Sequence, residues 1–507
     1  MKWLIYAVLS LFAFSQTIAK PEGNPKAKKM HLFISHYENV LGTSMEIKVS
    51  APSSSEDAKA ETAALQEIDR LSRILSGYDP SSEFSHWLKS SGEAVRVSKE
   101  LFEVLSLFDD WRSRTNGALD ASAEVINKLW KQAASNQRAP SQAELDLAIR
   151  EVQQKHWMLN SPAQTATHLD NAPLMLNSFT KSYIIRHAAE AAMATGQVDA
   201  VIVNIGGDLI VLGNIHENVS VSNPTADAEN DLPIDEVTIS NKAIATSGNY
   251  RRGELINGHW YSHIVDPRTG IPADHVISST VIADNATDAG ALATAFSVMD
   301  PKQSMALAST IHGVEYLIIT RSGEQIKSPG WDRLEVHDRN LINAGKSPDG
   351  SGWDQNFELL INLEINLQKE GFAKRPYVAV WVEDSTHLPL RTVAVWHGSE
   401  RYVPELKSWY LKYRGQYNSD RDFSSSVSSA TRSAGKYTLK WDGKDDKGND
   451  LKPGKYVIKI EVSREHGTYQ LMRQEINCDE SPKIINLSGN IEISSASLDY
   501  RKKTTNN

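Results

Sequence analysis

The sequence predicts two domains of different class: an α+β domain with a largely antiparallel sheet, followed by an all-β sandwich. At 507 residues, the chain is longer than one hydrophobic core usually organises. Helical and strand patterns alternate irregularly through residues 30–345, which is typical of a mixed α/β domain. Residues 353–485 carry strand patterns separated by turns. We therefore expect domains at 30–345 and 353–485, a linker at 346–352 and a tail at 486–507.

Two periodicities locate the elements of the first domain. Residues 31–50 alternate apolar and polar side chains, as a strand does. Between Ser53 and Gly77 the apolar residues recur every three or four positions, which predicts an amphipathic helix. The same reasoning predicts helices at 98–114, 142–154, 181–194 and 289–299, and strands at 199–213, 236–239, 243–247, 260–265, 277–283 and 313–320.

The second domain follows a run of turn-forming residues, KSPDGSG, which has no apolar side chain and predicts the linker. The Ser-rich residues 424–433 are expected to form a long loop, and residues 501–507 a disordered polar end. Strands are expected at 357–368, 377–383, 391–396, 437–441 and 455–462.

The amino terminus has the pattern of a secretory signal. Lys2 precedes an apolar run, and small residues precede a cleavage point near Ala19. An uncleaved anchor is the alternative. No later segment has the roughly 18 uncharged residues that a membrane helix needs. Removal of residues 1–19 would therefore leave an exported, periplasmic protein without a membrane span, either free or peripheral to the membrane.

Charge and cysteine content exclude other classes. The net charge of -9 argues against a general nucleic-acid binder, because no long basic face is available to displace counterions from phosphates. Cys478 is the only cysteine, which excludes an internal disulfide and a cysteine-based metal site. In an exported protein, a single thiol is expected to be inert and structural.

Residues 245–270, ATSGNYRRGELINGHWYSHIVDPRTG, have the composition of a ligand site. The run SGNYRR at 247–252 combines hydroxyl, backbone N–H and guanidinium groups, which suit phosphate oxygens. In DPRTG at 266–270, a proline and a glycine specify a turn around a charged pair. The alternative is two ordinary surface turns. A further candidate is Gly206-Gly207-Asp208, which interrupts a strand pattern and lets a ligand approach the backbone.

A series of motifs in order resembles the FAD:protein FMN transferase family of flavin-trafficking enzymes. It spans residues 31–343, and SGNYRR and SHIVDPRTG are its most specific members. The C-terminal part is similar to a β domain of unknown role fused to some members, most recognisably in DGKDDKGNDLKPGKYVIKIE. The other motifs are LGT at 41–43, LSGYDPSSE at 75–83, TNGALD at 115–120 with Trp130 following, KSY at 181–183, VNIGGD at 203–208 and ALATA at 291–295.

The resemblance implies transfer of FMN from FAD to a Thr or Ser hydroxyl of a partner protein, with release of AMP and a requirement for Mg²⁺. Cleavage of a pyrophosphate needs positive or N–H groups that neutralise the phosphoryl oxygens. The expected partner is an acceptor protein, such as a subunit of a membrane redox complex. The residues expected to bind the flavin nucleotide are Leu41, Tyr78, Ala118, Leu119, Asp120, Lys181, Gly206, Gly207, Asp208, Ser247 and Arg252.

Within this family pattern, His263 is the candidate base for the proton of the acceptor hydroxyl, because the pKa of an unperturbed imidazole lies near working pH. Asp266 would either orient His263 or help to hold the phosphates through the metal. The alternative for His263 is a strand-end side chain packed beside Trp260 and Tyr261. The resemblance assigns metal binding to Thr294 and to a backbone or hydroxyl oxygen of Ser178.

The chain departs from the family pattern at the metal. Members carry an aspartate four residues before the threonine, where this chain has Gly290. Asp288 is a candidate replacement ligand; alternatively, it only supplies charge and capping at a helix N-terminus. Members also read DLGGIAKGY, with a further aspartate five residues after the lysine, where this chain reads MLNSFTKSY at 175–183 and then Arg186. We therefore expect a rearranged Mg²⁺ site.

Three functions remain open at this point. The leading hypothesis is an exported, Mg²⁺-dependent flavin transferase. The same pocket could instead hydrolyse FAD to FMN and AMP, with water in place of the acceptor hydroxyl. The third hypothesis is a non-catalytic flavin-binding or assembly protein whose β domain recognises a partner.

Overall fold

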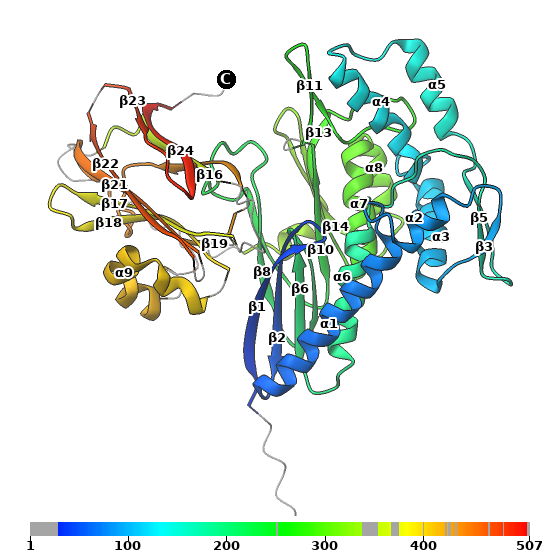
Figure 1. The fold of residues 1–507 in the computed structure, drawn as a ribbon, viewed down its shortest axis with the longest axis horizontal. Helices are drawn as coiled ribbons and strands as arrows, with labels where there is room; N and C mark the ends of the chain where they lie inside the picture. The colour runs from blue at the N-terminus through cyan, green and yellow to red at the C-terminus, as the bar shows by residue number, and fades with distance from the viewer. Residues whose placement is uncertain are drawn as a thin grey trace, which may run out of the picture.

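The computed structural model describes residues 29–503, except for 250–251, 337–352, 367–374, 399, 421–422, 424–426, 430, 433, 465–466 and 480. The predicted signal at 1–19 and the predicted linker at 346–352 lie outside the described residues. Figure 1 shows an α/β body followed by a body built mainly of strands, as the sequence predicts. None of the described helices is long and apolar enough to cross a membrane.

The centre of the first domain is an eight-stranded sheet with the order β1-β2-β6-β7-β10-β13-β14-β15. Every neighbouring pair is antiparallel, which confirms the predicted class. The strands are β1 (His31–Val40), β2 (Thr43–Ala51), β6 (Ala200–Ile205), β7 (Asp208–Gly213), β10 (Ala243–Gly248), β13 (Val276–Ala283), β14 (Glu315–Thr320) and β15 (Gln325–Lys327).

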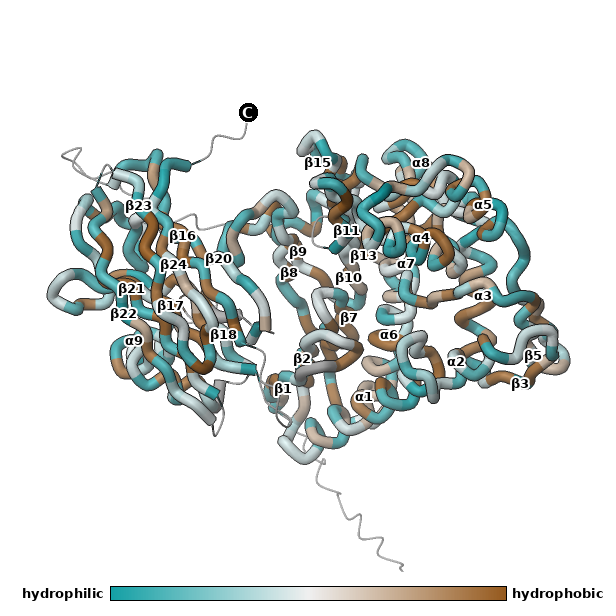
Figure 2. Tube along the Cα trace, turned by 45° about the horizontal axis from the view of Figure 1, so that its top comes forward, coloured by the Kyte–Doolittle hydropathy of each residue, from teal (hydrophilic) through white to brown (hydrophobic). Residues whose placement is uncertain are grey.

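Helices cover one face of this sheet. In β6, Val201, Val203 and Ile205 join the core shared with the helices, whereas Ile202 joins a second core on the opposite face. A strand buried on both faces reads as a continuous apolar run, as residues 200–203 of β6 do. Figure 2 shows the resulting apolar interior. The helices that pack on the sheet are α1 (Ser54–Leu75), α6 (Thr180–Met193) and α7 (Ala286–Val298). Three further helices, α2 (Glu83–Leu88), α3 (Lys99–Arg114) and α8 (Pro301–Ala308), pack against these and share the same core.

The opposite face is covered by a hairpin of β8 (Glu217–Val221) and β9 (Asp235–Ile239). Trp331, in the short helix η2 (Trp331–Arg333), is fully buried beneath it and donates Nε1–H to Asp235 Oδ2 at 3.0 Å. The hairpin is therefore fixed to the sheet by both apolar contacts and a buried hydrogen bond.

A smaller layer beside the sheet has a core of its own. It combines α4 (Glu124–Ser135) and α5 (Gln142–Val152) with the hairpin of β11 (Gly253–Ile256) and β12 (His259–Ser262). Trp130 in α4 packs on Tyr261 with ring centroids 4.7 Å apart and donates Nε1–H to the Gly270 carbonyl at 2.8 Å. A three-stranded sheet of β3 (Ala94–Arg96), β4 (Trp157–Asn160) and β5 (Thr165–His168) completes the domain.

The second domain is a sandwich of two sheets, with the orders β20-β16-β24-β23 and β19-β18-β17-β21-β22. Cys478 is buried in its core, and burial raises the pKa of this thiol to about 12, so the thiol is protonated at neutral pH. The strands are β16 (Phe357–Ile365), β17 (Tyr377–Asp384), β18 (Pro389–Trp396), β19 (Ser428–Ser429), β20 (Gly435–Trp441), β21 (Gly454–Ser463), β22 (Tyr469–Cys478), β23 (Lys483–Leu487) and β24 (Ile493–Lys502).

The predicted tail at 486–507 is wrong over most of its length, because β24 pairs with both β16 and β23. Ala496, Leu498 and Tyr500 point into the sandwich core. Serine and charged residues alternate with them on the outer face, and this polar half hides the strand pattern. Arg501 and Lys502, which were expected in a disordered end, lie in the strand.

The second domain also contains a helix that the sequence did not predict, α9 (Lys407–Ser419). It buries only Trp409 and Tyr413, against the outside of the five-stranded sheet. At the start of α9, the backbone N–H groups of Ser408 and Trp409 donate hydrogen bonds to the two oxygens of the buried Glu461 carboxylate, each at 2.7 Å. The helix start is therefore stabilised from a distant strand, which local sequence patterns do not reveal.

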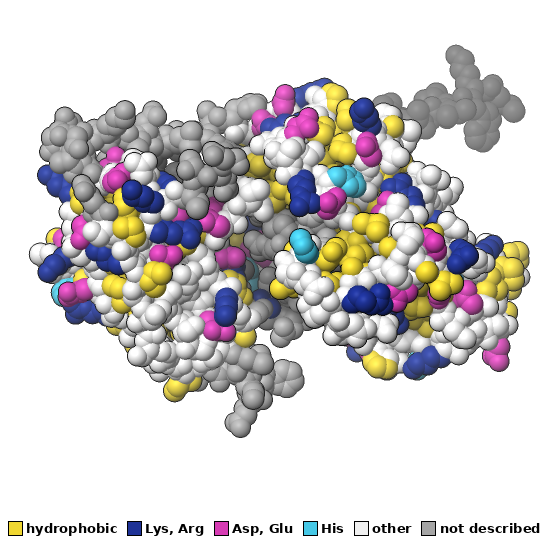
Figure 3. All heavy atoms as spheres, turned by 90° about the horizontal axis from the view of Figure 1, so that it is seen from above, with side chains coloured by type: hydrophobic (Ala, Val, Ile, Leu, Met, Phe, Trp, Pro, Cys, Tyr) yellow, Lys and Arg dark blue, Asp and Glu magenta, His cyan; other side chains and the backbone are white. Residues whose placement is uncertain are grey.

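The loop between β8 and β9 joins the two domains. The Glu229 N–H donates to the Thr438 carbonyl at 2.8 Å, and the Asn230 side chain bonds both the carbonyl and the N–H of Lys440 at 2.8 Å. Lys440 Nζ lies 2.6 Å from Asp227 Oδ1 and 2.9 Å from Asp231 Oδ1. On the face shown in Figure 3, acidic and basic side chains are interspersed on both domains.

Candidate functional site

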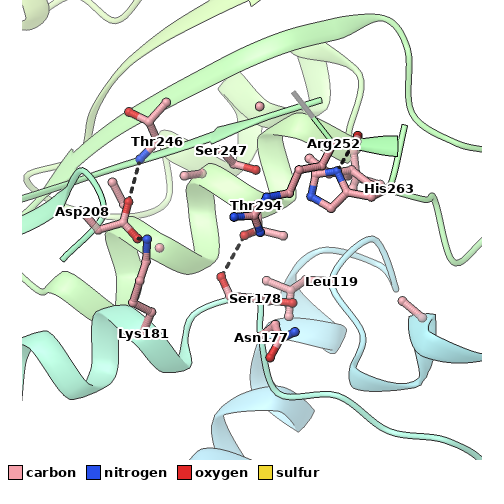
Figure 4. A pocket seen from close by; sticks show the side chains of 18 of the residues that line it. Leu119, Asn177, Ser178, Lys181, Asp208, Thr246, Ser247, Arg252, His263 and Thr294 are labelled. Atoms are coloured by element: carbon pink, nitrogen blue, oxygen red, sulfur yellow. Dashed lines mark hydrogen bonds and ion pairs between the residues drawn. The ribbon is translucent and has the colours of Figure 1, made fainter. Parts of the chain in front are cut away.

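The first domain contains a cavity of about 650 Å³ between the sheet, helices α6 and α7 and the segment before α4. This volume is typical of small-molecule sites. It brings together most of the residues predicted from the sequence, from segments far apart in the chain (Figure 4). These are Tyr78, Ala118, Leu119, Asp120, Ser178, Lys181, Gly206, Gly207, Asp208, Ser247, Arg252, His263 and Thr294.

Three predicted site residues do not line the cavity. Leu41 lies in the turn between β1 and β2, with a φ of 50° and 37% of its surface exposed. Asp288 lies in the first turn of α7, where burial raises its pKa and the charges of Arg114 and Arg186 oppose that rise. Asp266 is tied into its own turn.

Asp266 does not orient His263. Its carboxylate accepts from Arg268 Nε at 2.8 Å and from Arg268 Nη2 at 2.8 Å. Its backbone carbonyl accepts the Gly270 N–H at 2.8 Å. The DPRTG motif is thus a self-contained turn, anchored to α4 through the Trp130 bond to Gly270. Closeness in sequence to His263 suggested a contact, but the turn directs the carboxylate towards Arg268.

A two-glycine turn brings the backbone to the cavity between β6 and β7. Gly206 and Gly207 have φ values of 61° and 95°, in the region that side chains disfavour. A Cβ atom at Gly206 would also lie 2.7 Å from the Thr43 methyl carbon. The turn places the backbone of both glycines and the Asp208 side chain at the cavity wall.

Asp208 is the centre of a closed polar network. It is buried, with 8% of its surface exposed, and Lys181 Nζ lies 2.9 Å from Oδ2. The Thr246 N–H donates to Oδ1 at 3.2 Å. Figure 4 shows both contacts on the same side of the cavity. The Lys181 charge is therefore neutralised within the protein.

The other two carboxylates that line the described cavity are also paired. Arg112 Nε lies 2.8 Å from Asp120 Oδ2, and Asp120 Oδ1 accepts the Ser122 N–H at 2.8 Å. Lys131 Nζ lies 3.9 Å from Glu124 Oε1, a weaker contact. Carboxylates held in this way repel an anionic ligand less than free ones would.

Arg252 differs from these residues. Its guanidinium has no carboxylate or hydrogen-bond partner in the described part of the chain, and its side chain points into the cavity, towards the side where Thr294 lies (Figure 4). Tyr250 and Arg251, which belong to the same motif, lie outside the described residues. Arg252 is thus a cation placed to meet an anionic ligand.

His263 lies next to Arg252 at the end of β12. Its Nδ1 is 3.0 Å from the Arg252 carbonyl oxygen. A carbonyl only accepts hydrogen bonds, so Nδ1 carries the proton and Nε2 has a free lone pair. Partial burial lowers the pKa of His263, and the positive charges of Arg252 and Lys131 lower it further. The ring is therefore neutral at pH 7 and able to accept a proton.

A second recess of about 490 Å³ shares Asp120 and Pro267 with the first. Arg112 and Arg268 line this second recess, and each is paired with a carboxylate, Arg112 with Asp120 and Arg268 with Asp266. The sequence did not single out Arg112 as a site residue. It also missed Asn177, whose side chain donates to the Tyr78 hydroxyl at 2.7 Å at the cavity edge. In the sequence, the only indication that Arg112 belongs to the site is its position just before the TNGALD motif.

The residues at the expected metal position do not fit Mg²⁺. This ion prefers carboxylate ligands with near-octahedral geometry. Position 290 has no side chain, and Asp288 does not line the cavity. Thr294 Oγ1 donates to the Ser178 carbonyl oxygen at 2.8 Å. Among the described residues, no group of three or more His, Cys, Asp or Glu side chains is placed to hold a metal.

Comparison with known proteins divides the chain as the fold does. Residues 41–318 match the ApbE family, and residues 358–495 match a family described as "Predicted periplasmic protein (DUF2271)". The FAD:protein FMN transferase of Escherichia coli K12 is 26% identical over 314 residues, covering 59% of this chain and 88% of that protein. The FAD:protein FMN transferase of Treponema pallidum is 26% identical over 333 residues, covering 61% and 90%.

Solved structures give the same match for the first domain. The ApbE protein of Thermotoga maritima superposes with a TM-score of 0.54 at 26% identity, covering 60% of this chain and 100% of that chain. The apo form of the flavinyl transferase ApbE of Pseudomonas stutzeri has a TM-score of 0.50 at 21% identity, covering 60% and 96%, and shares the fold. The matched domain is the one that contains the cavity.

Proposed function

The chain belongs to the ApbE family, and we propose that it transfers FMN from FAD to a Ser or Thr hydroxyl of an acceptor protein, releasing AMP. The names of its relatives support flavin transfer. The observation that carries the proposal is the pairing of Arg252, an unneutralised cation, with His263, a neutral base, at one cavity wall. Two adjacent recesses that share Asp120 and Pro267 suit the two halves of a dinucleotide.

In the proposed step, the acceptor hydroxyl gives its proton to His263 Nε2 while its oxygen attacks the phosphorus on the FMN side. A bond forms between this oxygen and the phosphorus. The bond from the phosphorus to the bridging oxygen breaks, and AMP leaves with the bridging oxygen. The Arg252 carbonyl holds the ring through Nδ1, which fixes the tautomer that this step requires.

The family resemblance implies dependence on Mg²⁺, but each carboxylate among the described cavity-lining residues is already paired with a lysine or arginine. The protein's own cations must then meet the phosphoryl oxygens. Arg252 is the donor available for this, because the N–H groups of Gly206 and Gly207 already donate to the Ser44 carbonyl oxygen at 3.0 Å and to Asn204 Oδ1 at 3.1 Å.

The acceptor is proposed to be a protein outside the cytoplasm, such as a subunit of a membrane redox complex. The similarity of the second domain to a predicted periplasmic family supports this location. The predicted signal at residues 1–19 agrees with it.

The test is incubation of the processed chain with FAD and a flavin-acceptor protein. Transfer gives flavin fluorescence that stays with the denatured acceptor, together with an equal amount of AMP. AMP without labelled protein would replace the proposal with FAD hydrolysis. If neither product forms although FAD binds, the chain is a flavin-binding protein rather than a transferase.

A further inference from the structure

Ser182 on helix α6 and Gly290 on helix α7 both depart from the family pattern, and they lie next to each other in the fold. A Cβ atom added at Gly290 would lie 2.3 Å from Ser182 Oγ and 2.9 Å from Ser182 Cβ. Both distances are too short for real contacts. A side chain at position 290 therefore requires Ser182 to move or to be replaced by a smaller residue. Ser182 stands where the family pattern has a glycine, and Gly290 where it has an aspartate. The serine thus fills the space through which a carboxylate would enter.

The other groups at this position are already bonded to each other. Thr294 Oγ1 donates to the Ser178 carbonyl oxygen at 2.8 Å. On the sheet side, Asp208 Oδ2 lies 2.9 Å from Lys181 Nζ and accepts a long hydrogen bond from Ser182 Oγ at 3.5 Å. A hard divalent cation would have to displace the lysine or bind without a carboxylate, and both are unfavourable.

The cavity nevertheless has one cation that the described residues leave without a counter-ion. Lys181 is paired with Asp208, whereas Arg252 points into the cavity from the opposite wall (Figure 4). A guanidinium presents its donors in one plane and binds two phosphate oxygens at once.

We propose that Arg252, rather than a divalent cation, neutralises the pyrophosphate of the flavin dinucleotide in this pocket, and that Ser182 together with Gly290 excludes the ion. The inference rests on the proposed function only in taking FAD as the ligand. Its consequence is that FAD binds equally well with and without Mg²⁺.

The first test measures FAD binding to the processed full-length chain by flavin fluorescence, in excess EDTA and in millimolar MgCl₂. The two Kd values are expected to agree within about threefold. A Kd at least about tenfold tighter with Mg²⁺ would overturn the inference and leave the proposed function standing. No FAD binding in either buffer would overturn both.

The second test replaces the proposed cation. Arg252→Gln is expected to weaken FAD binding in EDTA about tenfold or more, and Arg252→Lys to weaken it less. The matched control is Arg321→Gln, which removes an exposed arginine paired with Asp274 on the surface. Because Arg252 has no described partner, its loss should leave the melting temperature unchanged. FAD binding by Arg252→Gln at the wild-type Kd would overturn the inference.

The third test rebuilds the ion site. In the double variant Ser182→Gly with Gly290→Asp, calorimetry at saturating FAD is expected to show Mg²⁺ binding, which is absent from the wild type and from Ser182→Gly alone. Mg²⁺ binding by the wild-type chain would overturn the inference. A double variant that binds FAD but not Mg²⁺ would overturn the assignment of ion exclusion to these two residues.

Discussion

The two walls of the pocket use their polar groups in opposite ways. On the helical wall, formed by α6 and α7, Lys181 is bonded to Asp208 and Thr294 to the Ser178 carbonyl. On the hairpin wall, which includes Arg252 and His263, the Arg252 guanidinium and the Nε2 atom of His263 have no such partners in the described structure. Polar groups that satisfy one another stabilise a fold, whereas groups left available can bind or react. We therefore expect mutations on the helical wall to affect mainly stability, and mutations on the hairpin wall to affect mainly chemistry.

The largest expected effect tests the hairpin wall. His263→Gln removes the proposed base and is expected to slow flavin transfer by about 10²–10⁴-fold while FAD binding changes little. Labelled acceptor measured over time gives the rate, and flavin fluorescence gives the Kd. The matched control is His259→Gln, an exposed histidine on the same hairpin. A parallel loss of binding and rate would mean that His263 holds the ligand and does not act as the base.

The second prediction concerns pH. Burial and the charges of Arg252 and Lys131 lower the pKa of His263 below 6.5, and a base must be neutral to accept a proton. The transfer rate should therefore be flat near neutral pH and fall about tenfold per pH unit below the lowered pKa. The profile of kcat/KM against pH measures this acid limb. Arg252→Gln removes a positive neighbour and should move the limb to higher pH, whereas a wild-type midpoint above 6.5 would contradict the proposed role.

The helical wall is tested by Lys181→Met, which leaves the buried Asp208 carboxylate without its counter-ion. The Lys181 side chain is 33% exposed, so after allowance for solvent screening we expect a loss of about 1–3 kcal/mol in the free energy of unfolding. Urea titration measures this loss. Asp208→Asn in the same background removes the unpaired charge and should restore part of the stability. Unchanged stability combined with lost activity would place Lys181 with the reactive wall instead.

The smallest effect is expected far from both walls, at the contact between the domains. Lys440→Met removes ion pairs that are each worth about 0–1 kcal/mol, and FAD binding should stay within about twofold of the wild type. The Lys440 hydrogen bond lowers the pKa of Asp227 below 3.8. The contribution of Asp227 is therefore present above pH 3.8 and lost as the pH falls through the folded value, a loss that unfolding curves at acid pH would detect. A larger change in FAD binding would show that this contact shapes the pocket through β8.

Local periodicity predicted the elements whose burial follows one regular face. Helix α3 buries Leu101, Val104, Leu105, Phe108 and Trp111, which recur every three or four positions as an amphipathic helix requires. Local periodicity failed to predict the elements whose structure depends on contacts with distant parts of the chain. Strand β24 is half polar and is held by two neighbouring strands, and α9 begins at a carboxylate from β21.

For the site as well, the sequence predicted what local motifs specify and missed what depends on distant contacts. Motif order assembled most of the cavity, because several motifs mark the end of a strand or the start of a helix, as VNIGGD does at the end of β6 and KSY at the start of α6. Asp288 could not be placed, since the sequence does not show which side of α7 faces α6 and which faces the ligand. The conflict between Ser182 and Gly290 involves residues more than a hundred positions apart, so only the packing of the two helices reveals it.

The loop that carries Glu229 and Asn230 lies along the outer side of β20, an end strand of its sheet. Unpaired strand edges recruit other strands, and proteins protect them with covering segments. Expression of the second domain alone, without this loop, would expose the backbone groups of Thr438 and Lys440. Such a fragment should self-associate through β20, so a soluble version of it needs either the loop grafted on or a charge placed on that edge.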